Sequence, residues 1–465
     1  MSRDAFASQE IWKDLSLKIQ GPPTSTPGLY HGVTYYYLLA IPYFMGQGDP
    51  RFAAIFLALI NSLTVIPIMF LAKDFFKKKS WIILSGLLFA VSFEANQFGP
   101  WLSNPSPAVF TVAMFFYSLR VWQKGNIWGL IGACFWAAVS TQFQFFLIAL
   151  FLLIPLFYIY LKPKVNNKGI LLAVLFTFIG LSTFIIAIIK FNSISQVVQA
   201  FSLISDSGSF EFRPQFSVIA SNYINRYADI FINNFFPVNS FIGGILGILS
   251  LYFARADKFL VFALLANIPI FALGGHNSPY VNIGMVTPVI LAVINFLRIV
   301  IEKRKLLGYL LISMIITSNL YMHFKIAPLG QIEFVIPNEM LLKNQLNLID
   351  KTYEIANGQP FSINSITLPI WNNTTWSYLY QWYGNKKYGY TPSFSGKDQI
   401  GLPGNNYLKY NQVPENINFL IIESNSGIPA ELVSQEMDTE NAKTTLREEM
   451  DFKGLKLQLR VKNEN

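Results

Sequence analysis

The strongest constraint on the fold of this chain is a series of long apolar runs. Two of them are FAAIFLALINSLTVIPIMFLA (52–72) and GILLAVLFTFIGLSTFIIAII (169–189). Each has the ~20 residues that an α-helix needs to cross a hydrocarbon core of about 30 Å. Of the 465 residues, 52% are hydrophobic and 16% are aromatic, which is typical of a membrane protein. The sequence therefore predicts a mainly α-helical, polytopic membrane bundle.

Ten apolar segments are candidate membrane spans. They are 52–72, 81–95, 105–122, 127–140, 143–161, 169–189, 239–254, 259–274, 281–300 and 306–324. Lys and Arg gather in every second connection, around 73–79, 120–124, 162–168, 255–258 and 303–305. Because cytoplasmic loops carry an excess of Lys and Arg, one orientation fits all ten spans and places these loops in the cytoplasm.

The net charge of +9 is unevenly placed along the chain. Residues 1–329 hold 23 of the 35 Lys and Arg but only 11 of the 26 Asp and Glu. This basic surplus is typical of loops that face anionic lipid. No patch of basic and aromatic residues indicates nucleic-acid binding. The single Cys134 lies in an apolar run, which excludes a disulfide framework within the chain.

The chain divides into three expected regions. Residues 1–51 form an external juxtamembrane loop with helices, 52–329 the transmembrane bundle, and 330–465 an extracytoplasmic α/β domain. We expect 32–46 to be an interfacial or re-entrant element, because this short run contains Pro42 and three tyrosines. The connection 190–238 reads as a long external loop.

Two of these regions carry patterns of secondary structure. In SQEIWKDLSLKI (8–19) the apolar residues fall on one helical stripe, which predicts a helix lying in the membrane interface. In the last region, 338–358 predicts a helix with a glycine stop, and 374–384 a short aromatic helix or loop. Strands are expected at 361–368, 418–424 and 455–461.

Several catalytic classes lack their motifs in this sequence. There is no P-loop, no dinucleotide-binding glycine fingerprint, no HExxH and no cysteine cluster, and His31, His276 and His323 lie far apart. The sequence therefore disfavours an ATPase, a dehydrogenase and a structural zinc site. The sequence indicates no metal and no cofactor, and a divalent-metal requirement stays open. Polar residues at the outer ends of the spans remain as functional candidates.

Two carboxylates are candidate general bases. Asp4, beside Arg3, opens the chain on the outer face, and Glu94 lies in the next external loop. Such a carboxylate can accept the proton of an acceptor hydroxyl while a basic group holds a phosphate. The alternative readings are solvated terminal charges for Arg3 and Asp4, and a water-exposed loop acid for Glu94.

The other candidates are substrate-binding side chains at the outer ends of spans. They are Arg3, His31, Tyr35, Trp101, Asn104, Gln142, Gln144, Arg213, Arg226, His276 and Tyr280. Asn104 or Ser106 reads as the cap of the helix that follows its prolines. Arg213 and Arg226 are the expected cations for a lipid phosphate. For each residue, an ordinary loop or interfacial role is the alternative.

Four stretches together resemble a known family. These are GPPTSTPGLYHGVTYYYLLAIP (21–42), the span at 51–76, WLSNPSPAVF (101–110) and TQFQFF (141–146). In this order they resemble the protein O-mannosyltransferase and aminoarabinose-transferase-like branch of the GT-C glycosyltransferases, which is family 39-like. The ordered resemblance covers roughly residues 3–150, with a weaker agreement in layout as far as residue 324.

The resemblance implies an activity, partners and a location. It implies transfer of a sugar, with inversion, from a polyprenyl-phosphate-linked donor to an external glycan, lipid or protein hydroxyl. Membrane lipid is the other expected partner, and no nucleic acid is expected. The protein would be a multi-pass protein of the cytoplasmic membrane, with its active site and C-terminal domain on the extracytoplasmic face. That domain is a candidate for acceptor recognition.

The sequence departs from this family in three places. Arg3-Asp4-Ala5 matches the end of the family's acidic pattern, so a first membrane helix and its acid are expected to precede Met1. Asp4 would then be a neighbour of the base. Val33 stands where a proline is usual, and Gln144 where a histidine is common. A transporter or flippase of lipid-linked saccharides, or a non-catalytic homologue, remains as the alternative.

Overall fold

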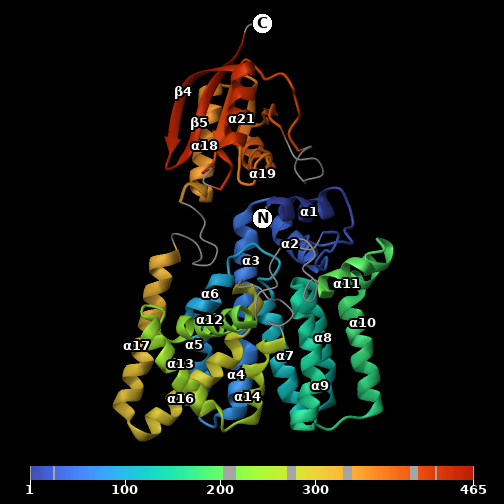
Figure 1. Cartoon of the computed structure of the whole chain (residues 1–465), viewed down its shortest axis with the longest axis vertical. Helices are drawn as coiled ribbons and strands as arrows, with labels where there is room; N and C mark the ends of the chain where they lie inside the picture. Colours follow the sequence, from blue (N-terminus) through green and yellow to red (C-terminus); the bar gives the residue numbers. More distant parts are fainter. Residues whose placement is uncertain are drawn as a thin grey trace. The chain divides into compact units, whose positions relative to one another are not determined.

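The computed structural model of the chain describes residues 2–24, 27–202, 216–269, 279–327, 338–397, 407–424 and 427–463. The chain forms two compact units. We call Leu17–Pro42 with Arg51–Pro328 the helical unit, and Met1–Ser16, Tyr43–Pro50 and Leu329–Asn465 the sheet unit. The fold is mainly helical, as the sequence predicts, with one small sheet near the C-terminus (Figure 1).

The described residues of the helical unit are mainly helical. The helices are α2 (Thr34–Met45, whose last turn belongs to the sheet unit), α3 (Pro50–Ser62), α4 (Val65–Phe75), α5 (Lys79–Val91), α6 (Phe93–Phe98), α7 (Ala108–Gln123), α8 (Ile127–Phe143), η1 (Phe145–Ala149), α9 (Leu150–Leu161), α10 (Asn167–Lys190), α11 (Ile194–Ser202), α12 (Phe216–Phe235), α13 (Ser240–Ala254), α14 (Lys258–Leu265), η2 (Pro279–Asn282), α16 (Val286–Lys303) and α17 (Lys305–Ile326). Each of the ten predicted spans overlaps one or more of these helices.

Only some of these helices are long enough to cross a bilayer alone. Within the described residues, three segments are long and apolar enough. They are α3 and α4 taken together (Pro50–Phe75), α10 (Asn167–Lys190) and α17 (Lys305–Ile326). Helices α12 and α13 meet the same criterion together, but they are bent by 99° where they join. Four further apolar helices are shorter, at 10–17 residues. Ten full spans therefore remain a prediction.

The expectation of a loop at 190–238 is wrong, because α11 and α12 occupy much of it. Helix α12 escaped the hydropathy pattern because about every turn carries a polar residue on one side. Asn222, Arg226, Asp229 and Asn233 recur at helical spacing and form a polar stripe. The opposite side is apolar, and Phe231 and Phe235 there are buried.

Small residues let the helices of this unit approach closely. Helix α7 packs on α8, and α8 packs on α10 (Figure 1). At Gly129 an added Cβ would lie 2.1 Å from the backbone nitrogen of Trp122, and at Gly180 it would lie 2.6 Å from the Cβ of Ala138. Such contacts are the usual means of helix association in membranes. Helices α7, α8 and α10 therefore form a tight layer, which positions Gln142 at the end of α8.

The sheet unit contains one five-stranded sheet. Its strands are β1 (Phe361–Ile366), β2 (Ser393–Phe394), β3 (Ile417–Ile422), β4 (Thr444–Phe452) and β5 (Leu455–Lys462). The order is β2-β1-β3-β5-β4, in which β1 pairs in parallel with β2 and β3, and the other pairs are antiparallel. All of β1 is buried, which is typical of a parallel strand covered on both faces.

The three predicted strands are confirmed as β1, β3 and β5, and two strands were missed. Strand β2 has only two residues, which is too short for a pattern. Strand β4 (TTLREEMDF) lies at the edge of the sheet and is mostly exposed. Charged residues protect such an edge from pairing with other chains, and they hide its strand character in the sequence.

The helices of the sheet unit come from distant parts of the chain. They are α1 (Ser2–Lys13), η4 (Asn338–Met340), α18 (Leu342–Ala356), α19 (Thr374–Leu379), a π-helical turn (Tyr380–Gly384), α20 (Asn385–Tyr388) and α21 (Ala430–Lys443). The predicted helix at 338–358 is confirmed as α18, and it ends at Asn357 and Gly358, both with positive φ. The aromatic segment 374–384 is helical.

The predicted interfacial helix at 8–19 is wrong in its bounds. Helix α1 ends at Lys13, where the backbone N–H of Ser16 closes the last turn onto the carbonyl of Glu10 at 3.1 Å. Leu15 adopts the left-handed conformation (φ 52°) that such a closure requires. The expected stripe therefore breaks, and Leu15 and Leu17 are exposed outside the helix.

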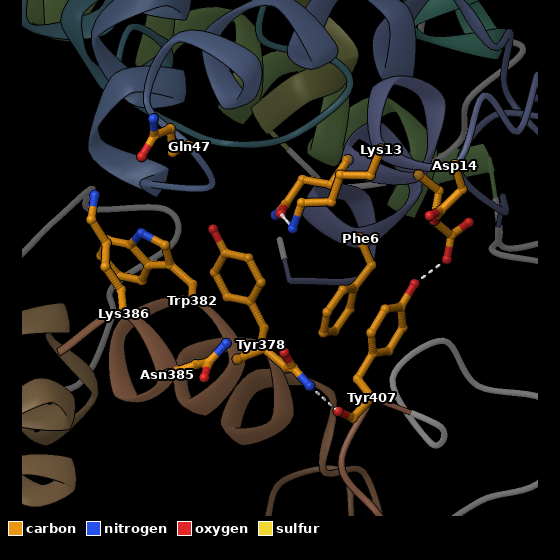
Figure 2. Close-up of a pocket in the computed structure, with 12 residues that line it drawn as sticks. Phe6, Lys13, Asp14, Gln47, Tyr378, Trp382, Asn385, Lys386 and Tyr407 are labelled. Carbon is orange, nitrogen blue, oxygen red and sulfur yellow. Dashed lines mark hydrogen bonds between the residues drawn. The ribbon is translucent and has the colours of Figure 1, made fainter. Parts of the chain in front are cut away.

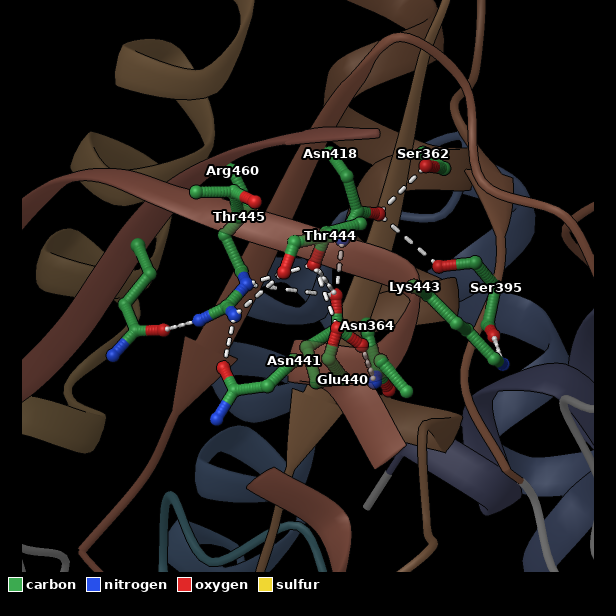
Figure 3. Close-up of polar contacts among 12 residues, drawn as sticks. Ser362, Asn364, Ser395, Asn418, Glu440, Asn441, Lys443, Thr444, Thr445 and Arg460 are labelled. Atoms are coloured by element: carbon green, nitrogen blue, oxygen red, sulfur yellow. Dashed lines mark hydrogen bonds and ion pairs between the residues drawn. The ribbon is translucent and has the colours of Figure 1, made fainter. Parts of the chain in front are cut away.

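A buried polar network joins α21 to the sheet (Figure 3). Glu440 accepts hydrogen bonds from Asn364 (2.7 Å), Asn418 (2.6 Å) and Thr444 (2.9 Å). The guanidinium of Arg460 donates to Thr444 Oγ1 at 2.8 Å, and it lies 3.9 Å from the Glu440 carboxylate. Buried charges are tolerated when they are paired and hydrogen-bonded in this way. We therefore assign this network to the stability of the sheet unit.

Candidate functional site

The glycine-rich stretch at 21–32 forms a narrow turn against α8. The backbone N–H of His31 donates to the Pro22 carbonyl at 2.8 Å, and that of Gly21 donates to the His31 carbonyl at 3.2 Å. At Gly32 an added Cβ would lie 2.2 Å from Gln142 Oε1 and 2.8 Å from Gln142 Cα. Only glycine permits this approach of two backbones. The stretch is thus a structured loop attached to the end of α8.

His31 is fixed by the break between α8 and η1. Its Nδ1 accepts a hydrogen bond from the backbone N–H of Phe145 at 3.3 Å. The neutral ring therefore carries its hydrogen on Nε2. The side chain is half-buried, so this predicted site residue is oriented by the fold.

Gln142 is the centre of a buried hydrogen-bond network at the same place. Its Oε1 accepts from Thr34 (2.7 Å) and Thr183 (3.0 Å), and its Nε2 donates to the Gly180 carbonyl (2.5 Å). These bonds join the first residue of α2 to α8 and α10. All three are internal, so Gln142 fixes the end of α8, against which Gly32 packs. Gln144 is buried nearby, in extended backbone at the end of α8.

Asn104 reaches the same end of α8 from the loop before α7. Its Nδ2 donates to the Phe143 carbonyl at 2.6 Å. The expectation that Asn104 or Ser106 caps α7 is wrong, because the helix begins at Ala108 with no side-chain cap. Ser106 donates instead to the Phe98 carbonyl at 2.6 Å. Trp101 lies beside Phe98, with ring centroids 6.1 Å apart.

Three predicted residues thus meet at positions 142–145. We call His31, Asn104 and Gln142 the α8-end cluster. Tyr35 follows in the first turn of α2 and is fully buried, with its ring 6.4 Å from that of Tyr36. The fold brings His31, Asn104 and Gln142 together although they lie far apart along the chain.

Glu94 belongs to a second group of polar residues, where α6, α12 and α17 meet. It lies in the first turn of α6, which Ser92 caps by accepting from the Ala95 N–H at 3.0 Å. Glu94 Oε2 accepts a hydrogen bond from Asn233 Nδ2 at 3.2 Å. The carboxylate is half-buried and lies at the positive end of a helix, so the reading as a solvated loop acid is wrong.

The contacts around Glu94 fix its position. Ser92 Oγ donates to Asn234 Oδ1 at 2.6 Å. Asn319 accepts from the Phe93 N–H at 2.8 Å and donates to the Asn234 carbonyl at 3.1 Å. Asn234 and Asn319 are nearly fully buried. We call Ser92, Glu94, Asn233, Asn234 and Asn319 the Glu94 cluster.

Arg226 lies on the same polar stripe of α12 as Asn233. It forms an ion pair with Asp229 at 3.5 Å. Helix α12 also packs against η2, which carries Tyr280. Arg226 therefore lies on the same side of α12 as Asn233 of the Glu94 cluster, and Tyr280 lies on an element that packs against this helix. Arg213 and His276 lie outside the described residues.

Arg3 and Asp4 are in the sheet unit. Asp4 is 3% exposed, and its Oδ1 receives Arg3 Nε at 2.9 Å and Nη2 at 2.7 Å. The reading as solvated terminal charges is therefore wrong for Asp4.

Sequence reasoning missed the asparagines and hydroxyls that hold these clusters. Asn319 interrupts an apolar helix and Asn234 follows a second asparagine, and such polar residues inside membrane segments are a recognisable signal. Thr34 and Thr183 give no comparable signal, because threonine is common in apolar helices. In the parts of the chain that the structure describes, no three His, Cys, Asp or Glu side chains are grouped to hold a metal ion.

Comparison with known proteins gives a structural likeness only. No protein-family model matches the sequence, and no curated protein matches it. Two solved structures of ArnT from Cupriavidus metallidurans are similar, one in the apo state and one bound to undecaprenyl phosphate. Their TM-scores are 0.59 and 0.61, at 10% sequence identity. The match covers 98% of this chain and 92% and 93% of those chains. The likeness shows that this chain shares the fold of those two structures, and it shows nothing further about the chain.

Proposed function

We propose that this chain is a membrane glycosyltransferase of the GT-C type, which moves a sugar from a polyprenyl-phosphate-linked donor to a hydroxyl of an acceptor. The observation that carries the proposal is the likeness in fold to ArnT over nearly the whole chain, including the structure bound to undecaprenyl phosphate. The resemblance in residues 3–150 supports it independently, because it was drawn from motifs and their order.

Glu94 is the general base in this proposal. It accepts the proton of the acceptor hydroxyl, whose oxygen forms a bond to the anomeric carbon of the sugar. The bond from that carbon to the phosphate oxygen breaks, and the electron pair leaves with polyprenyl phosphate. A single displacement of this kind inverts the anomeric centre. The bond from Asn233 and the first turn of α6 orient the carboxylate for this role.

Arg226 is the proposed partner of the donor phosphate. It lies seven residues before Asn233 on α12, which is two helical turns or about 10 Å along the axis. That separation leaves room for a sugar between a base near Asn233 and a phosphate near Arg226. The guanidinium would stabilise the charge that develops on the leaving phosphate.

The α8-end cluster and the remaining predicted residues have supporting roles. We assign His31 and Asn104 to the wall of the donor site, and Gln142 to fixing the end of α8 where they meet. Tyr35 stays a candidate substrate-binding residue. Trp101, Gln144, Tyr280, Arg213 and His276 stay candidate substrate-binding residues. Location in the cytoplasmic membrane, with the site on the extracytoplasmic face, belongs to the same proposal.

The proposal is tested with purified full-length protein in proteoliposomes. Labelled polyprenyl-phosphate mannose, glucose and arabinose serve as donors, and total membrane glycolipids and proteins serve as acceptors. We expect Glu94→Gln to lower the transfer rate by about 100-fold or more, which is the usual contribution of a general base. Glu302→Gln is the matched control, because Glu302 is exposed at the end of α16.

Two results would contradict the proposal. One is full transfer by the Glu94→Gln protein, which would remove this residue from the mechanism. The other is labelled donor that crosses the bilayer without any transfer, which would indicate the flippase alternative.

A further inference from the structure

The sheet unit contains a pocket that the proposed function does not use. Its volume is about 220 Å³, and all of its lining residues belong to the sheet unit. They come from α1, from the turn after α2, from α19 to α20, and from Tyr407 (Figure 2). The pocket is smaller than the roughly 300–1,000 Å³ of sites for drug-sized ligands, so it fits one ring-sized group.

Aromatic rings form much of the lining. Phe6 stacks on Tyr407 with centroids 3.6 Å apart and planes inclined by 11°. Phe6 also meets the edge of Tyr378 at 5.5 Å, and Tyr378 stacks with Trp382 at 6.2 Å. These contacts hold the four rings rigidly, at little entropic cost to a ligand that binds among them.

The polar lining combines donors and acceptors with balanced charge. Lys13 and Lys386 bring two ammonium groups, and Glu10 and Asp14 bring two carboxylates. Gln47 adds an amide. An ionic ligand would meet attraction and repulsion together. A neutral ligand whose hydroxyl groups both donate and accept would find partners of each kind.

The lining is organised before any ligand binds. The hydroxyl of Tyr407 donates to the Glu10 carboxylate, and Lys13 Nζ donates to Gln9 Oε1 at 2.8 Å. Burial and the bond to Glu10 raise the pKa of Tyr407, so its hydroxyl keeps the proton that it donates.

Gln47 has an exposed side chain and a left-handed backbone conformation (φ 50°), which is strained for any residue other than glycine. Such strain is retained where the surrounding structure requires it, and here the turn around Gly48 is held by the Tyr378 hydroxyl.

We infer that this pocket binds one neutral pyranose ring of the acceptor, so that the sheet unit selects glycan acceptors. Aromatic faces with a mixed polar rim match a sugar, which has apolar C–H faces and a belt of hydroxyl groups. That this sugar belongs to the acceptor rests on the proposed function. That the pocket binds a sugar rests on the chemistry of its lining alone. An apolar peptide side chain would leave the charged rim without partners, which disfavours it.

The test measures sugar binding without any lipid donor. Full-length protein in lipid nanodiscs, free of glycoside detergents, is titrated with methyl α-mannopyranoside and methyl β-glucopyranoside by saturation-transfer NMR. Mannose 6-phosphate and N-acetyl-leucinamide are the anionic and apolar comparison probes. We expect saturable binding of at least one neutral hexoside, and weaker binding of both comparison probes.

Variants then assign that binding to the pocket. Asn385→Ala and Lys386→Ala change exposed side chains on α20, and we expect each to weaken hexoside binding by about tenfold. Gln47→Gly removes the amide and suits the left-handed backbone, so it should weaken binding with no loss of stability. Lys343→Ala is the matched control, because Lys343 is an exposed lysine of α18 outside the pocket.

The inference is overturned if no hexoside binds, if N-acetyl-leucinamide or mannose 6-phosphate binds more tightly, or if the pocket variants bind as the wild type does. Its failure is separate from that of the proposed function. Transfer activity without hexoside binding would remove only the acceptor pocket. Hexoside binding without transfer from any donor would remove only the enzyme activity.

Discussion

At the scale of single residues, the helical unit depends on groups that fit one place only. Gly32 and Gln142 are the clearest pair, since the backbone of one lies against the side chain of the other. Their contact fixes the loop that carries His31. Gly32, which in the sequence looks like an ordinary turn glycine, therefore sets the geometry of the α8-end cluster.

Replacing Gly32 by alanine tests this dependence. The added Cβ would meet both Oε1 and Cα of Gln142, and the backbone atom has no room to move aside. We expect Gly32→Ala to destabilise the protein by about 1–3 kcal/mol, the usual cost of overpacking. Thermal unfolding in detergent measures the change.

Gly244→Ala is the control for that experiment. Gly244 is also a glycine of the helical unit, but no atom lies within 4 Å of the position that its Cβ would take. This variant should unfold at the wild-type temperature or slightly above it. Equal melting temperatures for the two variants would show that the contact at Gly32 is unimportant.

At the scale of secondary-structure elements, one buried carboxyl joins three parts of the sheet unit. Glu423 follows β3 and accepts hydrogen bonds from the Leu368 N–H after β1 (3.2 Å) and from the Trp376 indole of α19 (2.9 Å). Burial raises the pKa of Glu423 to about 7, although these two bonds oppose the shift. The protonated form is therefore favoured in the folded protein.

This shift predicts how stability depends on pH. Between pH 4.5 and 7 the folded state holds a proton at Glu423 that the unfolded state has lost, so stability falls as the pH rises. Above pH 7 the loss is complete, at about 3 kcal/mol from 1.36 kcal/mol per pKa unit. Glu423→Gln imitates the neutral form and removes this loss.

The comparison is made by thermal unfolding of the full chain at pH 5 and pH 8. Relative to the wild type, Glu423→Gln should be similar in stability at pH 5 and clearly more stable at pH 8. The Glu431→Gln protein, changed at an exposed position of α21, serves as the reference for a surface carboxyl. A constant difference between wild type and Glu423→Gln at both pH values would refute the shift.

The elements themselves were largely predictable from the sequence. Long apolar runs and the pattern FSINSI produce the helices and strands that they indicate, because burial and local conformation agree there. The pattern fails at α12, where Asn233 of the polar stripe bonds to Glu94 of α6, and at β4, whose charges protect an edge. In both elements the residue types are determined by tertiary contacts. A short stretch of sequence does not contain that information.

At the scale of the whole molecule, the candidate site was predictable in part. Residues at helix ends, such as His31 and Glu94, were found because polar groups are rare in an apolar chain. The partner of His31 is the Phe145 N–H and the partner of Glu94 is Asn233. Both come from distant segments, and spacing alone does not reveal them. The extracytoplasmic orientation, drawn from the basic loops, stays a prediction.

The most direct measurement of the central claim is the stoichiometry of the reaction. Purified protein is given a polyprenyl-phosphate donor labelled in the sugar, and both released polyprenyl phosphate and transferred sugar are quantified. If the protein is a glycosyltransferase of this kind, one molecule of polyprenyl phosphate is released for each sugar transferred, and the anomeric carbon is inverted. Intact donor that appears on the other side of the bilayer, with no polyprenyl phosphate released, would contradict it.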